Sequence, residues 1–263
     1  PKMLRHAFEL IPKWRADRDR YGHMLIALDF DGTIAPIVPH PEEAELLPEA
    51  RAALNALAQR EDTDIALISG RSLTDLVERI GIDDVYYAGN HGLEIRGPDL
   101  ADTVGGALEL QPRVQEIWHV LQDAVGDVAG VYLENKQLSL SVHYRKVDDE
   151  RVQQRIEADV RRVFDEHRDG LRLTSGKRVL EVRPDIDWHK GKALLFIIAD
   201  IERARGARML PMFVGDDKTD EDAFAALPES EAGVLVGSPD TKTAAGSYVR
   251  TPDEVVQLLE QLF

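Results

Sequence analysis

The chain has 263 residues, of which 43% are hydrophobic and 30% charged; its formal net charge at pH 7 is −16, and it contains no cysteine. The acidic balance argues against nucleic acid or an anionic membrane as partner, no apolar run approaches the ~20 residues of a membrane span, and disulfides, thiolate metal sites and a cysteine nucleophile are excluded. We therefore expect a soluble, cytoplasmic protein of one large or two modest domains, and the composition leaves its oligomeric state open.

Short apolar runs alternate with helix-like segments along most of the chain. Residues 1–20 form either a helix or a loose tail. The predicted buried strands are Met24–Leu28, Ile65–Ile68, Val85–Ala88, Met209–Val214 and Val234–Val236, and the predicted helices are Pro41–Gln59, Ser72–Ile80, His189–Arg205, Thr219–Leu227 and Pro252–Leu262. This alternation indicates an α/β fold with a parallel sheet covered on both faces, which binds ligands at the carboxyl ends of its strands.

The middle of the chain has a different pattern. Residues 131–144 and 171–182 alternate between polar and apolar side chains, the second stretch around a turn at Ser175 and Gly176. Helices are expected at about 113–124 and 148–167, after a hinge candidate at Gly105 and Gly106. Alternation of this kind is typical of a sheet with one solvated face. We expect a core domain of residues 1–102 and 183–263, with residues 103–182 inserted as a smaller α+β domain.

The stretch LDFDGT places two carboxylates at the end of the first buried strand. In extended backbone, Asp29 and Asp31 point the same way while Phe30 points into the core. Gly32 permits a tight turn, and Thr33 offers a hydroxyl and an amide. One carboxylate could then attack while the other moves a proton. The alternatives are a plain turn or a calcium loop, but an EF-hand loop continues with further ligands and does not follow a buried strand.

Two further stretches bring groups suited to a phosphate. Ser69 and Gly70 in ALISGRS end the second buried run, where a hydroxyl and helix amides bind phosphate oxygens; the alternative is an ordinary turn with Ser72 as helix N-cap. Lys190 and Lys192 in DWHKGKALL open a helix. A cation is disfavoured there unless it faces acidic groups and a phosphate, and the alternative is a solvated surface charge.

The stretch FVGDDKTDEDAF gathers acids after another buried run. Asp216 follows the strand directly, and Asp220 lies four residues later, so the two can share a helix face. A solvated helix start is the alternative reading. Oxygen ligands from two strand ends suit Mg²⁺, which would offset the repulsion between the acids.

Taken in order, LDFDGT, LISGRS, WHKGKA and VGDDKTDEDAF resemble the four motifs of the haloacid dehalogenase superfamily of phosphotransferases. The long separation between the second and third motifs resembles the subgroup with a cap domain inserted there. More narrowly, DFDGTIAPIVPHPEEA, AGNHGLEI, SLSVHYR, LEVRP, HKGKAL and GDDKTDEDAF are similar to the trehalose-6-phosphate phosphatases, over residues 25–259. The resemblance implies a Rossmann-like parallel-sheet core with an inserted smaller α+β cap domain.

The resemblance also implies roles for individual residues. Asp29 is the expected nucleophile and Mg²⁺ ligand, and Asp31 the general acid/base whose main-chain carbonyl also binds the metal. Asp216 completes the metal ligands, with Asp217 and Asp220 near or behind them. Ser69 binds the phosphoryl group and Lys190 balances its charge. The implied substrate-binding residues are Thr33, Gly70, Asn90 and His91 in the core and Glu134, Lys136, Glu181 and Arg183 in the cap.

Three functions are compatible with this constellation. The first is Mg²⁺-dependent hydrolysis of trehalose 6-phosphate, a small sugar phosphate, to trehalose and phosphate through an aspartyl-phosphate. The second is the same chemistry on mannosyl-3-phosphoglycerate or glucosylglycerol phosphate; a carboxylate-bearing substrate would need cap cations, for which the candidates are Arg145, Lys146, Lys177 and Arg183. The third is a catalytically silent sugar-phosphate sensor, which should have lost one of the acids or the lysine, and none is lost.

Overall fold

The structure is a computed structural model that describes residues 3–262. The chain divides into two compact units. The first contains the chain up to Asp102 and from Trp188 onward, and the second runs from Thr103 to Asp187. Within the described residues, no helix is long and apolar enough to cross a membrane.

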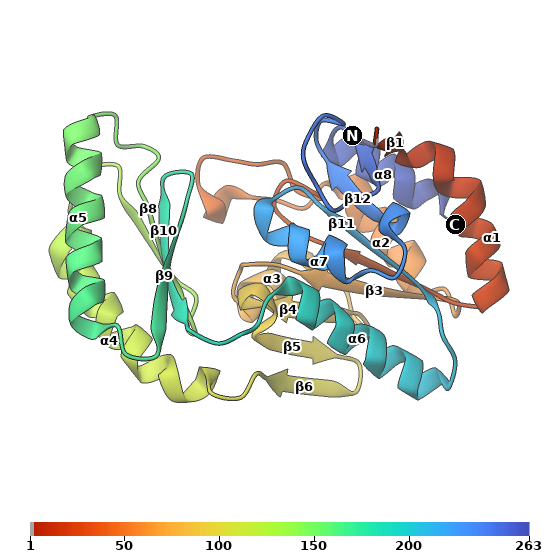
Figure 1. The fold of residues 1–263 in the computed structure, drawn as a ribbon, viewed down its shortest axis with the longest axis horizontal. Coiled ribbons are helices and arrows are strands. Elements are labelled where there is room, and N and C mark those ends of the chain that lie inside the picture. The colour runs from red at the N-terminus through yellow and green to blue at the C-terminus, as the bar shows by residue number, and fades with distance from the viewer. Residues whose placement is uncertain (1–2, 263) are drawn as a thin grey trace. The chain divides into compact units, whose positions relative to one another are not determined.

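The first unit is built on a nine-stranded sheet (Figure 1). All neighbouring strands from β1 to β4 in the sheet pair in parallel, and β5 pairs antiparallel to β4. The order across the sheet is β1 (Arg5–His6), β13 (Ser247–Val249), β12 (Gly233–Val236), β11 (Leu210–Gly215), β2 (Met24–Leu28), β3 (Thr63–Ile68), β4 (Tyr86–Gly89), β5 (Glu94–Gly97) and β6 (Leu100–Thr103).

Helices connect these strands in the alternating pattern that the sequence predicts. They are α1 (Ile11–Tyr21), α2 (Pro48–Ala58), α3 (Leu73–Ile80), α6 (Lys190–Arg205), α7 (Glu221–Ala226) and α8 (Pro252–Gln261). Short 3₁₀ turns lie at η1 (Ala7–Leu10), η2 (Pro41–Glu43), η3 (Asn90–Gly92), η4 (Lys218–Asp220) and η5 (Ser230–Ala232). The predicted α/β class and its five buried strands are confirmed.

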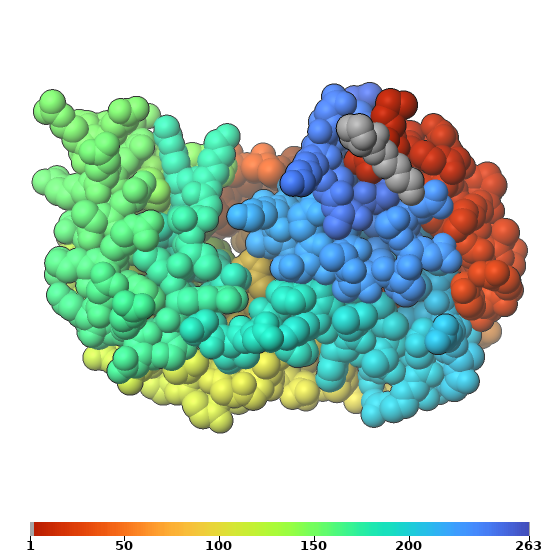
Figure 2. Space-filling model, in the orientation of Figure 1, coloured from red at the N-terminus to blue at the C-terminus, as the bar shows by residue number. Residues whose placement is uncertain are grey.

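The chain leaves the two central strands in opposite directions. From β2 it passes through α2 to β3, and from β11 it passes through α7 to β12, on the other side of the central pair. Because crossovers between parallel strands are right-handed, α2 and α7 must lie on opposite faces of the sheet. On the face in view, α6 and α7 cover the strands (Figure 2). The carboxyl ends of β2 and β11 therefore meet at the switch point, where such folds bind ligands.

The central strands form the middle of the hydrophobic core. Every residue of β2 and of β11 is buried, and their apolar side chains pack with helix residues from both faces. Burying a side chain such as Leu25 or Ile26 contributes roughly 1.5–3 kcal/mol. This rigid centre holds the strand ends in place.

Two predicted elements differ in detail. The helix predicted from Pro41 begins only at Pro48, because Leu47, which precedes a proline, is extended with ψ 132°. The segment left open as a helix or tail contains β1, η1 and α1 in its described part. The short strands β1, β5, β6 and β13 were not predicted, since none of them is a buried apolar run.

The second unit contains a four-stranded antiparallel sheet and two helices. The order of its strands is β7 (Tyr132–Asn135), β8 (Leu140–His143), β10 (Val179–Pro184) and β9 (Leu171–Gly176), with α4 (Ala107–Val125) and α5 (Glu150–His167). One face packs against the helices through Leu140, Val142, Leu180 and Val182. The predicted alternation with one apolar face is confirmed.

Three boundaries in the second unit differ from the sequence analysis. The hairpin turn lies at Lys177 and Arg178, not at Ser175 and Gly176, since Gly176 pairs with Val179 and Arg178 adopts φ +59°. Helix α4 starts at Ala107, earlier than predicted. Residues 183–187 were assigned to the first unit but belong to the second, because β10 continues through Pro184.

Candidate active site

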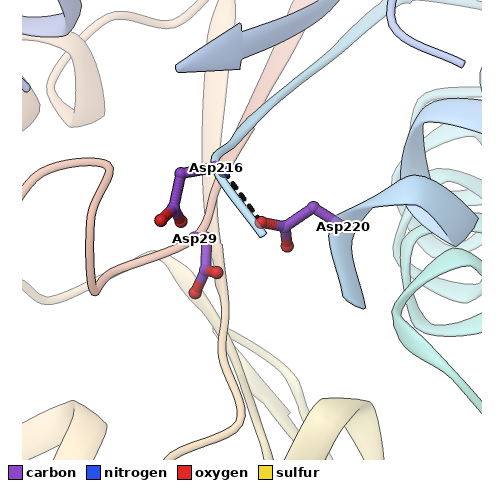
Figure 3. A group of neighbouring side chains, drawn as sticks. All are labelled: Asp29, Asp216 and Asp220. Atoms are coloured by element: carbon purple, nitrogen blue, oxygen red, sulfur yellow. Dashed lines mark hydrogen bonds between the residues drawn. The ribbon is translucent and has the colours of Figure 1, made fainter. Parts of the chain in front are cut away.

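Two carboxylates meet at the switch point because their strands are neighbours. Leu28 of β2 pairs with Val214 of β11, and the Asp29 amide donates to the Val214 carbonyl at 2.9 Å. Asp29 follows the end of β2, and Asp216 follows β11. Together with Asp220, they place one carboxylate oxygen each within 4.8 Å of one another (Figure 3).

Lys190 reaches this cluster from the first turn of α6. Its ammonium donates to Asp29 Oδ2 and to Asp220 Oδ1, both at 2.8 Å, and its side chain is only 2% exposed. His189 caps the helix, because its Nδ1 accepts hydrogen bonds from the amides of Gly191 and Lys192. Gly191 lets α6 approach closely, because a Cβ there would lie 2.3 Å from the Asp222 carbonyl oxygen. The predicted contact between Lys190 and acidic groups is present.

Asp220 is a buried organiser of the cluster. Its Oδ2 accepts hydrogen bonds from the amides of Asp216 and Asp217, at 2.9 and 3.0 Å, while Oδ1 accepts from Lys190. Both of its oxygens are thus engaged, which distinguishes it from Asp216 as a ligand candidate. The Asp217 side chain is exposed and accepts hydrogen bonds from Thr219 and the Asp220 amide.

The cluster holds more negative than positive charge. Burial raises the pKa of Asp29 well above its usual range, and the Asp220 charge acts in the same direction against Lys190. Burial and Asp220 also raise the pKa of Asp216 to about 7. Burial lowers the pKa of Lys190, but the charges of Asp220 and Asp29 outweigh it and raise that pKa. The Lys190 side chain, which stays protonated, thus faces three carboxyl groups that lie close together.

This arrangement fits a divalent cation. When all three carboxylates are ionised, the single ammonium leaves two negative charges uncompensated in a mostly buried site, and a cation would favour that ionised state over the protonated one. Hard oxygen donors from Asp29 and Asp216 are the ligand type that such cations prefer. Gly32 adds room next to Asp216: its φ is +76°, and a Cβ there would lie 2.0 Å from Asp216 Oδ2. The donor set and the charge both suit a metal.

Asp31 is not part of the three-carboxylate cluster. Its side chain, 41% exposed, is held by Arg71, which donates from Nε to Oδ2 at 2.8 Å and from Nη2 to Oδ1 at 2.7 Å. Phe30, between the two acids, is fully buried as predicted. Arg71 was not predicted as a site residue; its place directly after Ser-Gly at a strand end is the signal that could have identified it.

The predicted phosphate-binding and substrate-binding residues of the first unit follow neighbouring strands of the same sheet. Ser69 is buried after β3, and its Oγ accepts a hydrogen bond from the Arg71 amide at 3.1 Å. Gly70 lies against the ring of His91, where a Cβ would come within 2.6 Å of Cε1. Asn90 and His91 follow β4 with positive φ values, and Asn90 Nδ2 donates to Glu94 at 2.8 Å.

Thr33 contacts Asp216. It is fully buried, and its hydroxyl donates to Asp216 Oδ1 at a long 3.4 Å. A cavity of about 440 Å³ borders Asp216 and is lined by residues that include Gly32, Ile37 and Arg250. Asp216 therefore lies between the carboxylate cluster and this cavity.

The predicted substrate residues of the second unit gather on the polar face of its own sheet. Lys136 is 2.9 Å from Glu181 and 3.8 Å from Glu134, and Arg183 is 3.7 Å from Glu181. The backbone explains the grouping, because Ser141 pairs with Glu134 on one side and with Glu181 on the other. The four side chains form one cluster of ion pairs, in which Lys136 also donates a hydrogen bond to Glu181.

Comparison with known proteins points to one family. The trehalose-phosphatase family model matches residues 27–253. A protein of Oryza sativa subsp. japonica named "Probable trehalose-phosphate phosphatase 3" is 37% identical over 256 residues, which cover 91% of this chain and 69% of that protein.

Solved structures share the fold. The C-terminal domain of the C. albicans trehalose-6-phosphate phosphatase matches with a TM-score of 0.75 at 22% identity, covering 96% of each chain. A haloacid dehalogenase-like hydrolase from Bacteroides thetaiotaomicron matches with a TM-score of 0.63 at 16% identity, covering 92% of this chain and all of that one. At these identities the likeness concerns the fold.

Proposed function

Because this chain belongs to the trehalose-phosphatase family, we propose that it hydrolyses trehalose 6-phosphate to trehalose and phosphate. The observation that supports this most directly is the buried contact between Lys190 and Asp29 beside Asp216, at the switch point of the sheet. Hydrolysis through a phosphoryl-enzyme needs a positioned nucleophile and positive charge that offsets the phosphate, since phosphate monoesters are among the slowest bonds to hydrolyse.

We propose Mg²⁺ as the cofactor, held by the carboxylates of Asp29 and Asp216 and by the main-chain carbonyl of Asp31. Mg²⁺ prefers a few carboxylates together with water and substrate phosphate. When bound, it neutralises negative charge, so that an anionic nucleophile and an anionic phosphate can approach each other. The excess of carboxylates over ammonium groups in the cluster supports this assignment.

The chain's own side chains can perform both halves of the reaction. An Asp29 oxygen attacks phosphorus, and the bond from phosphorus to the sugar oxygen breaks as Asp31 donates a proton to that oxygen. Asp31 then takes a proton from a water molecule, which attacks the aspartyl-phosphate and releases phosphate. Lys190 offsets charge on the phosphoryl group, and Ser69 with the Gly70 amide binds its oxygens. Thr33, Asn90 and His91 complete the proposed substrate site in this unit.

We assign recognition of the sugar to the polar cluster of the second unit. Glu134, Lys136, Glu181 and Arg183 offer both donors and acceptors, as sugar hydroxyls require. A site that hydrogen-bonds hydroxyls rejects analogues that lack them, because its polar groups would be left unpaired.

A panel of phosphate esters tests this function. Phosphate release is measured with Mg²⁺ and with a chelator, on trehalose 6-phosphate, glucose 6-phosphate, mannosyl-3-phosphoglycerate and glucosylglycerol phosphate. We expect a strong preference for trehalose 6-phosphate and no activity with the chelator. Preference for one of the other esters would identify that ester as the substrate. Binding of trehalose 6-phosphate without hydrolysis would indicate a sensor.

A further inference from the structure

Arg71 is held in one orientation by several elements of the first unit. Besides its two hydrogen bonds to Asp31, it donates from Nη1 to Asp75 Oδ2 at 2.8 Å and from Nη2 to the Pro41 carbonyl at 2.7 Å. Its side chain is 6% exposed, compared with 41% for Asp31. The guanidinium carbon also lies 5.3 Å from the centre of the Phe30 ring. Two donors of the buried guanidinium, Nε and Nη2, thus form a fixed fork that holds the more exposed Asp31 carboxylate.

The partners of Arg71 are themselves fixed. Asp75 lies in the first turn of α3 and also accepts a hydrogen bond from Arg79 Nε at 2.8 Å. Arg79 donates onward to the Ala44 carbonyl at 2.6 Å. Ser72 caps the same helix by accepting from the Asp75 amide. The position of the fork is therefore set by α3 and by the segment around η2.

We propose that Arg71 is a positioning residue for the reaction, which fixes the carboxylate of Asp31 where it exchanges protons with the leaving sugar oxygen and with water. This inference rests on the proposed function. A carboxylate has about four lone-pair positions, so two remain for substrate and water after the fork is made. Proton transfer requires the carboxylate within hydrogen-bond reach of the reacting oxygen, and a misplacement of about 1 Å can cost 10²-fold in rate.

The planar fork is what the proposal depends on. Lysine keeps a positive charge but presents it as a point on a flexible stem, so Arg71→Lys loses the two parallel hydrogen bonds. Arg60 offers a matched control, because it makes the same two contacts with Asp62, at 2.8 and 2.7 Å, at the other end of β3. Arg60→Lys should leave the reaction unchanged.

Release of the leaving group in a single turnover distinguishes a positioning role of Arg71 from a role in folding alone. We use two substrates: trehalose 6-phosphate, whose leaving oxygen needs a proton, and p-nitrophenyl phosphate, whose leaving group departs without one. Arg71→Lys should slow trehalose release by roughly 10- to 100-fold, with p-nitrophenol release within about threefold of wild type and, in separate steady-state assays, KM little changed. Asp75→Asn, which removes one support of the fork, should give a weaker change in the same direction.

A double variant asks whether Arg71 acts through Asp31. In an Asp31→Asn background, Arg71→Lys should slow trehalose release no further, since coupled residues are not additive. Equal losses on both substrates, a further loss in the double variant, or wild-type rates in Arg71→Lys would each overturn the proposal. A wild-type protein that releases no trehalose from trehalose 6-phosphate would overturn the proposed function as well, whereas an active wild type confines the failure to Arg71.

Discussion

A lysine in the first turn of a helix faces the positive end of the helix dipole, and Lys190 occupies that position in α6. Burial adds a desolvation cost, because the ammonium is almost fully removed from water. The two hydrogen-bonded carboxylates of Asp29 and Asp220 offset both costs. Lys190 and the acids are thus mutually dependent, and replacing one side alone leaves buried charge without a partner.

Asp216 should determine divalent-cation binding. A ligand that binds only the folded state stabilises it, so Mg²⁺ at 100 times its Kd should add about 2.7 kcal/mol to the free energy of unfolding. We expect Mg²⁺ to raise the Tm of the wild type by several degrees and to have little effect on Asp216→Asn. Thermal unfolding with and without Mg²⁺ measures this.

Asp222→Asn is the matched control, since Asp222 is an exposed acid of the same segment. It should keep the full Mg²⁺-dependent increase in Tm. An equal increase in Asp216→Asn would remove Asp216 from the ligand set.

At the scale of elements, the sequence predicts the central strands well and the connections less well. Buried strands such as β2 can be recognised in the sequence as apolar runs, because both of their faces are covered. The edge strand β1 buries little, and its place depends on pairing with β13, which is distant in the sequence. The predicted helix start at Pro41 was wrong, because the restriction that Pro48 imposes on the backbone of Leu47 outweighs helix propensity.

The candidate site could likewise be predicted only in part. Asp29 and Asp216 follow predicted strands, so their meeting follows from strand order once β2 and β11 are adjacent. The fork from Arg71 to Asp31 could not be predicted, since the two belong to loops after different strands and side-chain direction decides the contact. Motif resemblance supplied residue roles that spacing alone does not contain.

The cap of α3 should contribute measurably to stability. Ser72 Oγ accepts a hydrogen bond from the Asp75 amide at 3.2 Å. Removing such an N-cap typically lowers the free energy of unfolding by about 1 kcal/mol. Ser72→Ala should lower the free energy of unfolding by about that amount in urea denaturation, whereas Ser72→Asp should stay within a few tenths, because aspartate also caps. Equal stability of all three proteins would show that the cap has no energetic role.

The pair of Arg60 and Asp62 at the start of β3 should make stability depend on acid pH. Hydrogen bonds from Arg60 and Thr63 lower the pKa of Asp62 to about 2, below the value of 3.8 expected without these contacts. A lowered pKa in the folded state stabilises at pH above 3.8, and this contribution is lost as the pH falls toward 2. Both side chains are 34% exposed, so we expect less than about 1 kcal/mol.

Urea denaturation of the wild type and Asp62→Asn at several pH values measures this. The difference in unfolding free energy should be largest near neutral pH and shrink as the pH falls below about 4. A difference that stays constant with pH would contradict the assignment.

At the scale of the whole molecule, we propose that chemistry and sugar recognition belong to different units. Glu181→Ala should raise KM or lower kcat/KM for trehalose 6-phosphate by 10-fold or more, by analogy with the ~10- to 200-fold discrimination that pocket contacts provide. The effect on p-nitrophenyl phosphate should be small, because that ester has no sugar. Steady-state kinetics on both substrates provide the comparison.

Glu166 provides the control for this variant. It lies on α5 of the same unit, with 56% of its side chain exposed and its Oε1 3.6 Å from Arg162 Nη1. Glu166→Ala should behave as wild type on both esters. Equal losses on both esters in Glu181→Ala would assign that residue a structural role instead.

The phosphoryl group itself gives the most direct test of the account. Wild-type protein is mixed with trehalose 6-phosphate and Mg²⁺, quenched in acid during turnover, and digested for peptide mass analysis. We predict one phosphoryl group on the peptide that contains Asp29, and neither phosphorylation nor turnover in Asp29→Asn, whose far-UV circular dichroism should match the wild type. A phosphoryl group on another residue, or ordinary turnover by Asp29→Asn, would contradict the account.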